Sequence, residues 1–462
     1  MSRPSRACVR PGGCRAARTG QRASVCPNPS LEVEVHLLRR SEPTRRAARG
    51  VALVAAVVTT VALTAGCGTA GDSNEASGPP ACDAPGFSAN EIKIGFVYPD
   101  SGHLASALGA ALPGFVARIE KQNAAGGIHG RRLVYEWNDD AANAGENLQA
   151  VRALVEEKDV FGIVQSTIAT SGGAGWLRDR GIPVVGLPAE PLWADRAYPN
   201  MFTHAFLYSA GPGVDTFGAF VKARGGTRAA VIGSDVDAVS DQIGQKITDG
   251  FRAVGIEVVP TRFVYNPQHT DAVQLGKQLK AAGVDTVLGS TSAVNIGEIM
   301  RGLRAANAPV KVFLAPTGYD HQVLADKGAV MAGLYTYLNY KPFESKTPAH
   351  DEYLAAVARY TPELQPPDQE LALVTYILTD IFLTGLEKAG SCPTRAGFIS
   401  TLRGLRGYTA GGLMPGEIDF QDDWGQLNTC YTFMRVNEAG TGYEVVKDPA
   451  GADQWCGNRL SP

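Results

Sequence analysis

Residues 91–140 constrain the fold of this chain more than any other stretch. They open with a short apolar run, Glu91–Tyr98, which a Pro-Asp-Ser-Gly turn ends. From 103 to 122 apolar residues recur at three- and four-residue spacing, which predicts a helix that Gly126-Gly127 ends. Leu133–Trp137 then forms a second predicted strand. The loop of this strand–helix–strand unit lies at the carboxyl end of a strand, where open α/β sheets bind ligands.

Strands and helices alternate along most of the remaining chain, a pattern typical of parallel sheets covered by helices. This alternation of strands and helices is interrupted at the Gly- and Pro-rich residues 209–213 and then resumes. We therefore predict an α/β fold with two doubly wound parallel-sheet lobes. A strand is expected at 258–265, and a hairpin at Cys430–Val436 and Tyr443–Val446. The expected segments are an N-terminal extension with a signal peptide (1–66), a tether (67–90), lobe 1 (91–208), lobe 2 (209–338), a return to lobe 1 (339–429), and a C-terminal hairpin and tail on lobe 2 or the hinge (430–462).

The N-terminal region predicts export. An uncharged run, Val51–Gly66, follows a basic flank and is shorter than the roughly 20 residues that span a bilayer. It ends Leu63-Thr-Ala-Gly-Cys67, which resembles the lipobox of bacterial lipoproteins, in which the cysteine carries the lipid; the alternative is an ordinary signal peptide. Residues 1–34 fit neither a signal nor a fold, and we expect translation to begin near Val35. The Gly-, Ser- and Pro-rich residues 68–81 would form a flexible tether.

Four further cysteines predict disulfide bonds in an exported protein: Cys82, Cys392, Cys430 and Cys456. Two bridges can form in three connectivities. The pairing Cys392–Cys430 with Cys82–Cys456 is preferred, because the first bridge closes a compact segment. Metal ligation would need closer spacing, such as Cys-x-x-Cys, which this chain lacks.

Composition and motifs disfavour several classes of function. A net charge of -3, with an acidic balance after the basic N-terminus, gives no reason to expect nucleic acid as a partner. The sequence has no Gly-x-Ser-x-Gly elbow between a strand and a helix, no phosphate-binding loop and no dinucleotide fingerprint. Asp235 and Asp237 could bind a cation or act as an acid and a base, but a solvated loop explains them better. We therefore do not expect this protein to be an enzyme or to bind a cofactor or a metal ion.

Small hydrogen-bonding groups recur where the predicted strands end. Hydroxyls and free amides beside helix N-termini suit a carboxylate or another compact polar group, although each could instead be a helix cap. These groups are Ser101-Gly102, Ser166-Thr167, Ala189, Ser234-Asp235 and Ser290-Thr291.

Several of these residues resemble a known family. Glu91-Ile-Lys-Ile-Gly followed by Ser101-Gly102, and above all Asn123-Ala-Ala-Gly-Gly-Ile-His-Gly130, are similar to the leucine/isoleucine/valine-binding proteins of bacterial ABC transporters. The resemblance covers roughly residues 91–446. It implies a type 1 periplasmic binding fold, in which two α/β lobes are joined by three hinge crossings and the ligand is buried between them.

The resemblance also assigns roles to individual residues. It implies that Ser166 bonds a ligand carboxylate, that Ser101 and Gly102 lie near the ligand, and that Ala189 contacts its ammonium group. The second lobe departs from the family pattern. The acidic residue expected near Thr317-Gly318-Tyr319 is not evident, although Asp320 is adjacent.

These observations predict a lipid-anchored solute-binding subunit of an ABC importer on the outer face of the cell membrane. The expected partners are a small amino-acid-like, amide or carboxylate solute and a membrane permease, and the chain is expected to be a monomer. The alternatives are a sensor coupled to a signalling partner and, with less support, a hydrolase or amidase. The predicted ligand-binding residues are Ser101, Gly102, Ser166, Thr167, Ala189, Asp235, Ser290 and Tyr319, with Cys67 as the site of lipid attachment.

Overall fold

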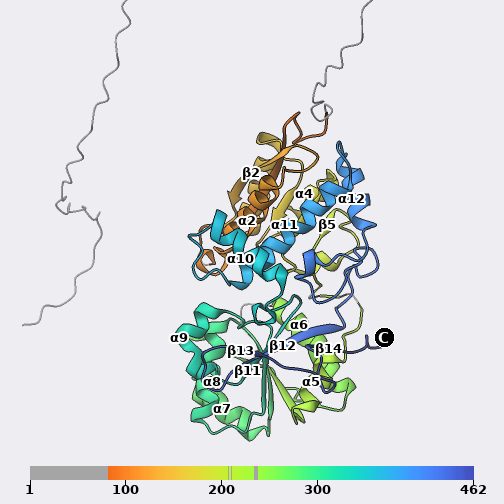
Figure 1. The fold of residues 1–462 in the computed structure, drawn as a ribbon. Coiled ribbons are helices and arrows are strands. Elements are labelled where there is room, and N and C mark those ends of the chain that lie inside the picture. The colour runs from red at the N-terminus through yellow and green to blue at the C-terminus, as the bar shows by residue number, and fades with distance from the viewer. Residues whose placement is uncertain (1–81, 103, 207, 210, 234–237, 462) are drawn as a thin grey trace, which may run out of the picture. The chain divides into compact units, whose positions relative to one another are not determined.

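Two separate β-sheets organise the chain in the computed structural model (Figure 1). The structure describes residues 82–102, 104–206, 208–209, 211–233 and 238–461, with the side chains of 238–241 excepted. The predicted signal peptide, residues 67–81 of the predicted tether with the proposed lipid-attachment site Cys67, and Ser234, Asp235 and Asp237 therefore lie outside the described residues. Among the helices of the described residues, none is long and apolar enough to span a membrane.

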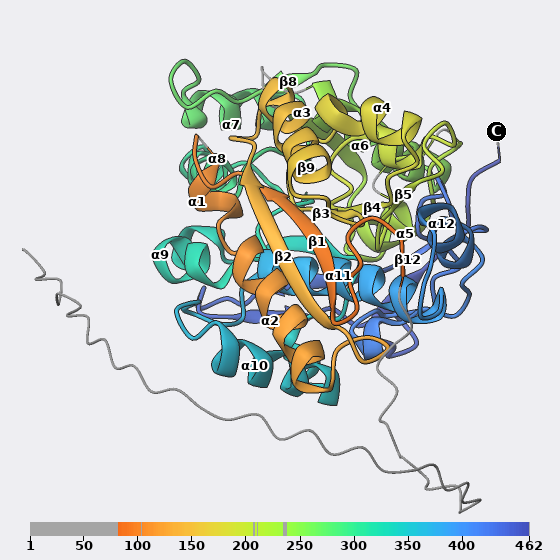
Figure 2. The ribbon, with the colours of Figure 1, turned by 90° about the horizontal axis from the view of Figure 1, so that it is seen from above.

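The first sheet has five parallel strands in the order β2-β1-β3-β4-β5, which Figure 2 shows from above. β1 is buried along nearly its whole length, as expected for a central strand covered by helices on both faces. The strands are β1 (Glu91–Tyr98), β2 (Arg132–Asp139), β3 (Ile163–Gln165), β4 (Val184–Gly186) and β5 (Met201–Phe202).

Helices from two distant parts of the chain cover this sheet. The helix expected over 103–122 is two helices, because the chain breaks at Gly109-Ala110. α2 packs closely on α11, since a Cβ added at Gly114 would lie 2.1 Å from the carbonyl oxygen of Ala372. The helices here are α1 (Ala105–Leu108), α2 (Ala111–Ala124), α3 (Ala144–Arg152), α4 (Ser171–Asp179), α10 (Pro348–Tyr360), α11 (Glu370–Lys388) and α12 (Arg395–Arg403).

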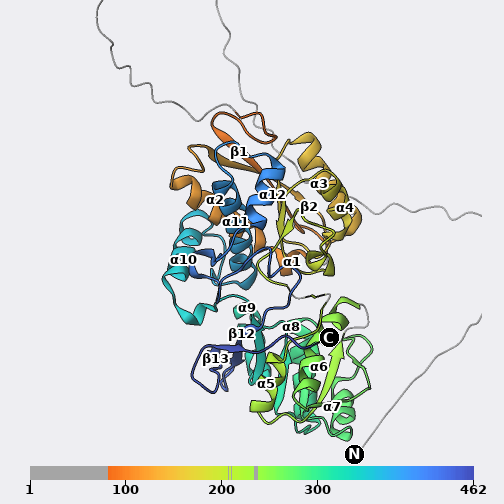
Figure 3. The same ribbon diagram turned by 90° about the vertical axis from the view of Figure 1, so that its right-hand side faces the viewer.

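The second sheet follows the order β13-β12-β11-β10-β9-β6-β7 and is parallel from β6 to β11. β12 and β13 form the expected antiparallel hairpin at its edge, and the blue end of the chain thus lies among the green and teal elements in Figure 3. The strand expected at 258–265 is two short strands, β7 and β8, each paired with β6. The strands are β6 (Arg228–Gly233), β7 (Glu257–Val258), β8 (Phe263–Val264), β9 (Thr286–Ser290), β10 (Val312–Ala315), β11 (Leu334–Leu338), β12 (Cys430–Val436), β13 (Tyr443–Val445) and β14 (Gln454–Cys456).

Helices also cover the second sheet, and both sheets confirm the predicted α/β fold of parallel-sheet layers and helices. Three stretches of chain pass between the two groups of elements: one after β5, one after β11 and one before β12. The helices are α5 (Thr216–Ala223), α6 (Ala238–Ala253), α7 (Ala272–Ala281), α8 (Ala293–Ala305) and α9 (His321–Met331).

The disulfide pairing preferred from the sequence is wrong. The bonds are Cys82–Cys392 and Cys430–Cys456. Cys430 and Cys456 face each other because β12 and β14 pair in antiparallel register, so the sheet places the two cysteines side by side. Cys392 follows α11, whose packing on the first sheet carries it to the segment that precedes β1.

The Asn-x-x-Gly-Gly-Ile-x-Gly sequence has a structural role. The Asn123 carboxamide donates to the carbonyl oxygen of Leu133 (3.0 Å) and accepts from its N–H (2.8 Å), which ties the end of α2 to β2. Gly127 has φ +74°, and a Cβ there would lie 1.9 Å from the carbonyl oxygen of Arg131. Only glycine fits this turn, so the signature residues define the unit without needing a ligand.

Candidate functional site

The loop after β1 is held to the end of β2. Ser101 is exposed, and its hydroxyl donates to Asp139 Oδ2 at 2.5 Å. Burial opposes ionisation of Asp139, but hydrogen bonds from Ser101 and from the backbone N–H groups of Ala141, Ser101 and Asp100 lower the pKa of its carboxyl. Gly102 is exposed, with φ +85°. Ser101 and Gly102 therefore lie together in a loop that Asp139 orders.

The ligand-binding residues predicted after β3 and β4 make hydrogen bonds to other groups of the protein. Ser166 is fully buried, and its hydroxyl lies 3.0 Å from Oγ1 of Thr375 on α11. The buried Thr167 hydroxyl accepts from the N–H of Ala169. The carbonyl oxygen of Ala189 accepts from the hydroxyl of Tyr208 at 3.2 Å.

Replacing Ser166 by Ala separates a structural role of this serine from ligand binding. The loss of a buried hydrogen bond should lower the free energy of unfolding by about 1 kcal/mol. If Ser166 also bonds a charged ligand group, the solute affinity should fall by a further 1–3 kcal/mol or so. Denaturant unfolding and calorimetric titration measure the two effects. The control is Thr379→Ser, which keeps a buried hydroxyl on α11, the helix that carries Thr375. An unchanged affinity in Ser166→Ala would remove the serine from the ligand site.

In the loop between β10 and α9, Tyr319 is buried, and its hydroxyl makes two hydrogen bonds. Its hydroxyl donates to Glu344 Oε2 at 2.6 Å and accepts from the N–H of Phe343 at 2.9 Å. Burial and the Glu344 carboxylate raise the pKa of Tyr319. Asp320 caps α9 by accepting from two backbone N–H groups, so Glu344 is the acid that meets Tyr319. Ser290 is buried at the end of β9.

A cavity lies where three of these regions meet, and we call it the Glu370 cavity. Leu187 and Pro188 reach it from the end of β4, Pro316 from the end of β10, and Glu370 from the first turn of α11. The volume of the cavity is about 120 Å³, which is smaller than the roughly 300–1,000 Å³ of typical ligand pockets. The remaining lining residues are His204, Ile243, Tyr337, Leu338, Asn339, Tyr340 and Val374.

Glu370 is the acid of this cavity. The Tyr340 hydroxyl donates to its Oε1 at 2.5 Å. Burial raises the pKa of Glu370 to about 7, against the lowering effect of the Tyr340 hydrogen bond. Burial also raises the pKa of Tyr340, as does the neighbouring carboxylate. The pair can therefore present either a carboxylate or a neutral acid near neutral pH.

More acidic groups surround Tyr319, whose ring centroid lies 6.5 Å from that of Tyr340. His321 stands between two carboxylates, with Nε2 3.5 Å from Glu344 and Nδ1 3.6 Å from Asp368. Among the described residues lining the Glu370 cavity, none is a lysine or an arginine. The local arrangement thus favours a solute with a positively charged or hydrogen-bond-donating group.

The predicted ligand-binding set and the cavity lining differ. None of the predicted residues that the structure describes lines the Glu370 cavity, although Ala189 directly follows Pro188. The sequence patterns do not single out Tyr340 or Glu370 as ligand-binding residues. Two signals could have found them: Tyr340 ends an aromatic strand segment, and Glu370 is the acid that opens a long apolar helix. Within the described residues, no group of three or more His, Cys, Asp or Glu side chains could hold a metal ion.

Comparison with known proteins agrees with this architecture. The family model for periplasmic binding proteins matches residues 91–441. The leucine-, isoleucine-, valine-, threonine- and alanine-binding protein of Pseudomonas aeruginosa is 25% identical over 309 residues, which is 66% of this chain and 80% of that protein.

Two solved structures share the fold. One is a solute-binding protein of an ABC transporter from Rhodopseudomonas palustris in complex with 3,4-dihydroxybenzoic acid. It is 17% identical with a TM-score of 0.62, over 80% of this chain and 96% of that one. The other is a fatty acid ABC transporter substrate-binding protein from Thermomonospora curvata. It is 17% identical with a TM-score of 0.63, over 80% of this chain and 94% of that one. The family model matches most of the chain, and helices cover both of its parallel sheets. The chain therefore belongs to the periplasmic binding protein family and has the type 1 fold of the leucine/isoleucine/valine-binding proteins.

Proposed function

We propose that this protein is the extracytoplasmic solute-binding component of an ABC importer and that it binds an amino-acid-like solute in the Glu370 cavity. The Glu370 carboxyl, set among apolar and aromatic side chains, is the observation that supports this proposal best. An amino group placed against a partly buried carboxylate forms a charge-assisted hydrogen bond, which is stronger than a neutral one.

The rest of the lining suits the apolar part of such a solute. Leu187, Leu338 and Val374 offer aliphatic surface, and Tyr337 adds an aromatic ring. Burial of aliphatic solute surface against these side chains would contribute about 25 cal/mol per Å². The carboxylate of the solute would then need donors from elsewhere. Ser101 and Gly102, and Ser166 with Thr167, remain our proposal for that role. Asp235, Ser290 and Tyr319 on the second lobe are proposed to complete the site.

The related proteins bind chemically different acids, which makes the solute class a question for experiment. The Pseudomonas relative is named for leucine, isoleucine, valine, threonine and alanine. The two structural relatives are named for an aromatic acid and for fatty acids. All three solute classes carry a carboxylate, but only amino acids add an ammonium group. Glu370 distinguishes these solute classes, because its ionised carboxylate attracts an ammonium group and repels another carboxylate.

A ligand screen by thermal shift, followed by calorimetry, tests the proposal. The panel is leucine, isoleucine, valine, their amides, benzoate, 3,4-dihydroxybenzoate and octanoate. At 100 times its Kd, a solute should raise the free energy of unfolding by about 2.7 kcal/mol. We expect stabilisation by an amino acid or its amide. Binding of benzoate or octanoate, with no response to any compound that carries an amino group, would overturn the amino-acid-like assignment.

The location of the protein is part of the same proposal. The basic flank, short apolar run and Leu-Thr-Ala-Gly-Cys67 sequence support export and lipid attachment at Cys67, so that the protein presents its solute to a membrane permease. Cell fractionation of Cys67→Ser should move the protein from the membrane to the soluble fraction. Retention of the variant in the membrane would contradict the anchor.

A further inference from the structure

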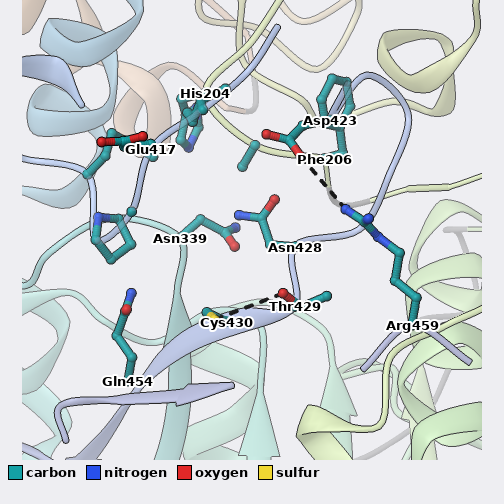
Figure 4. A pocket seen from close by; sticks show the side chains of 15 residues that line it. His204, Phe206, Asn339, Glu417, Asp423, Asn428, Thr429, Cys430, Gln454 and Arg459 are labelled. Atoms are coloured by element: carbon teal, nitrogen blue, oxygen red, sulfur yellow. Dashed lines mark hydrogen bonds and ion pairs between the residues drawn. The ribbon is translucent and has the colours of Figure 1, made fainter. Parts of the chain in front are cut away.

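A second cavity lies where all three crossing stretches pass between the two sheets, and we call it the Asn428 cavity (Figure 4). His204 and Phe206 come from the stretch after β5, Asn339 directly follows β11, and Asn428 precedes β12. The volume of the cavity is about 180 Å³. The cavity shares only His204 and Asn339 with the Glu370 cavity, so these two side chains lie at the boundary of both.

Two buried polar atoms at this boundary have no hydrogen-bond partner among the described residues: Nδ1 of His204 and Oδ1 of Asn339. The two residues are only 5% and 8% exposed, respectively. Leaving one buried donor or acceptor unsatisfied costs about 1–3 kcal/mol, and native proteins seldom do so. A bound molecule that supplies hydrogen bonds at this place would remove that cost.

The groups that face the cavity are polar but carry little net charge. Burial lowers the pKa of His204 to about 4, so its imidazole is neutral near pH 7 and offers one donor and one acceptor. Asn428 and Gln454 add carboxamides. At the rim, Arg459 Nη2 lies 3.7 Å from Asp423 Oδ1, so these opposite charges offset each other.

Apolar side chains complete the lining and give the cavity a mixed character. Phe206 is buried, with Met414 and Pro415 as further lining residues, and Figure 4 shows Asn339 and Asn428 in the space between Phe206 and the β12 strand. Glu417 is an exposed acid at the edge. A neutral molecule with several hydroxyl groups and a C–H face matches such a lining, because a hydroxyl can both donate and accept and an aromatic ring can cover the C–H face.

We propose that the Asn428 cavity is a second binding site, which takes a small uncharged polyhydroxylated molecule such as a monosaccharide or a cyclic polyol. Its hydroxyl groups would pair with His204, Asn339 and Asn428. The proposal does not rest on the identity of the solute in the Glu370 cavity. Because the site is built from all three crossing stretches, its occupant would contact each connection between the two sheets.

Calorimetry and ligand-observed NMR of the full mature chain test this site, with D-glucose, D-ribose, myo-inositol and glycerol as probes at up to about 10 mM. We expect at least one probe to bind. Asn428→Ala and the isosteric Asn428→Leu should each weaken that probe by about 10-fold or more, which is the loss of one or two hydrogen bonds. Glu370→Gln is the matched control, because Glu370 lines only the other cavity, and it should leave the probe affinity unchanged.

The outcomes separate the two cavities. Weaker probe binding in both Asn428 variants, with solute affinity and thermal unfolding unchanged, supports a second site. If none of the four probes binds, the unpaired atoms are met by water alone and the proposal is wrong. It is equally wrong if a probe binds the Asn428 variants as tightly as the unaltered protein, or if Glu370→Gln abolishes probe binding.

Discussion

Raising the pH from about 4.5 to about 8 is expected to lower the free energy of unfolding of the unliganded protein through Glu370. The folded-state pKa of this carboxyl is about 7, above its usual 4.5, because burial penalises the charged form. The folded state therefore holds the proton more tightly than the unfolded chain, and this preference is lost progressively as the pH rises from 4.5 to 7. For a partly exposed side chain we expect a loss of about 1–3 kcal/mol.

Glu370→Gln should remove this pH dependence, since an amide does not titrate. Urea unfolding of both proteins at several pH values measures it, and the variant should gain stability relative to the parent as the pH rises. Glu352→Gln is the matched control. Lys121 lowers the pKa of Glu352, so this variant should instead lose relative stability above the carboxyl pKa. Parallel stability curves for Glu370→Gln and the parent would show that Glu370 titrates normally.

The same titration reveals the charge of the solute. A solute whose ammonium group meets Glu370 binds the ionised form, so its affinity should rise between about pH 5 and pH 8, by up to about 100-fold for a pKa near 7. A solute whose carboxylate meets Glu370 should show the reverse trend, because it needs the protonated acid as a donor. A flat profile in the parent would remove Glu370 from contact with the charged group of the solute.

Loss of the Cys82–Cys392 disulfide should destabilise the protein by about 2–5 kcal/mol. The bond joins residues separated by 310 positions, so its removal frees a long closed loop in the unfolded chain. It also holds the segment before β1, where Arg131 adds a second tie by donating to the carbonyl oxygens of Ser88 (3.0 Å) and Ser391 (2.7 Å).

Denaturant unfolding of Cys82→Ser/Cys392→Ser checks this expectation. The control is Cys430→Ser/Cys456→Ser, whose bond spans 26 positions and joins strands that the sheet already pairs. The loop-entropy argument predicts a smaller loss for the control. An unchanged unfolding midpoint in the first variant would mean that Arg131 and the surrounding packing hold the N-terminal segment without the disulfide.

Much of the binding site depends on contacts between distant parts of the chain. Ser166 and Thr167 follow a strand in the predicted way, but α11 packs on that strand and brings Thr375 against the Ser166 hydroxyl. Helix α11 also carries Glu370 to the end of β4. No local sequence pattern predicts these contacts, because the spacing of residues 166, 187 and 370 along the chain has no relation to their distance in space.

The sequence by itself determined the elements and the family. Apolar periodicity and glycine-bearing turns act over a few residues, so they predicted the β1–α2–β2 unit, most later strands and helices, and the β12–β13 hairpin. The Asn123–Gly130 signature is equally local, since Asn123 and Gly127 act on residues within ten positions. Only the tertiary structure decided the disulfide pairing, the Tyr340–Glu370 pair and the two cavities. These features depend on how α11 and the crossing stretches pack. Hydrophobic burial drives that packing between residues far apart in the sequence, so no pattern within one segment predicts it.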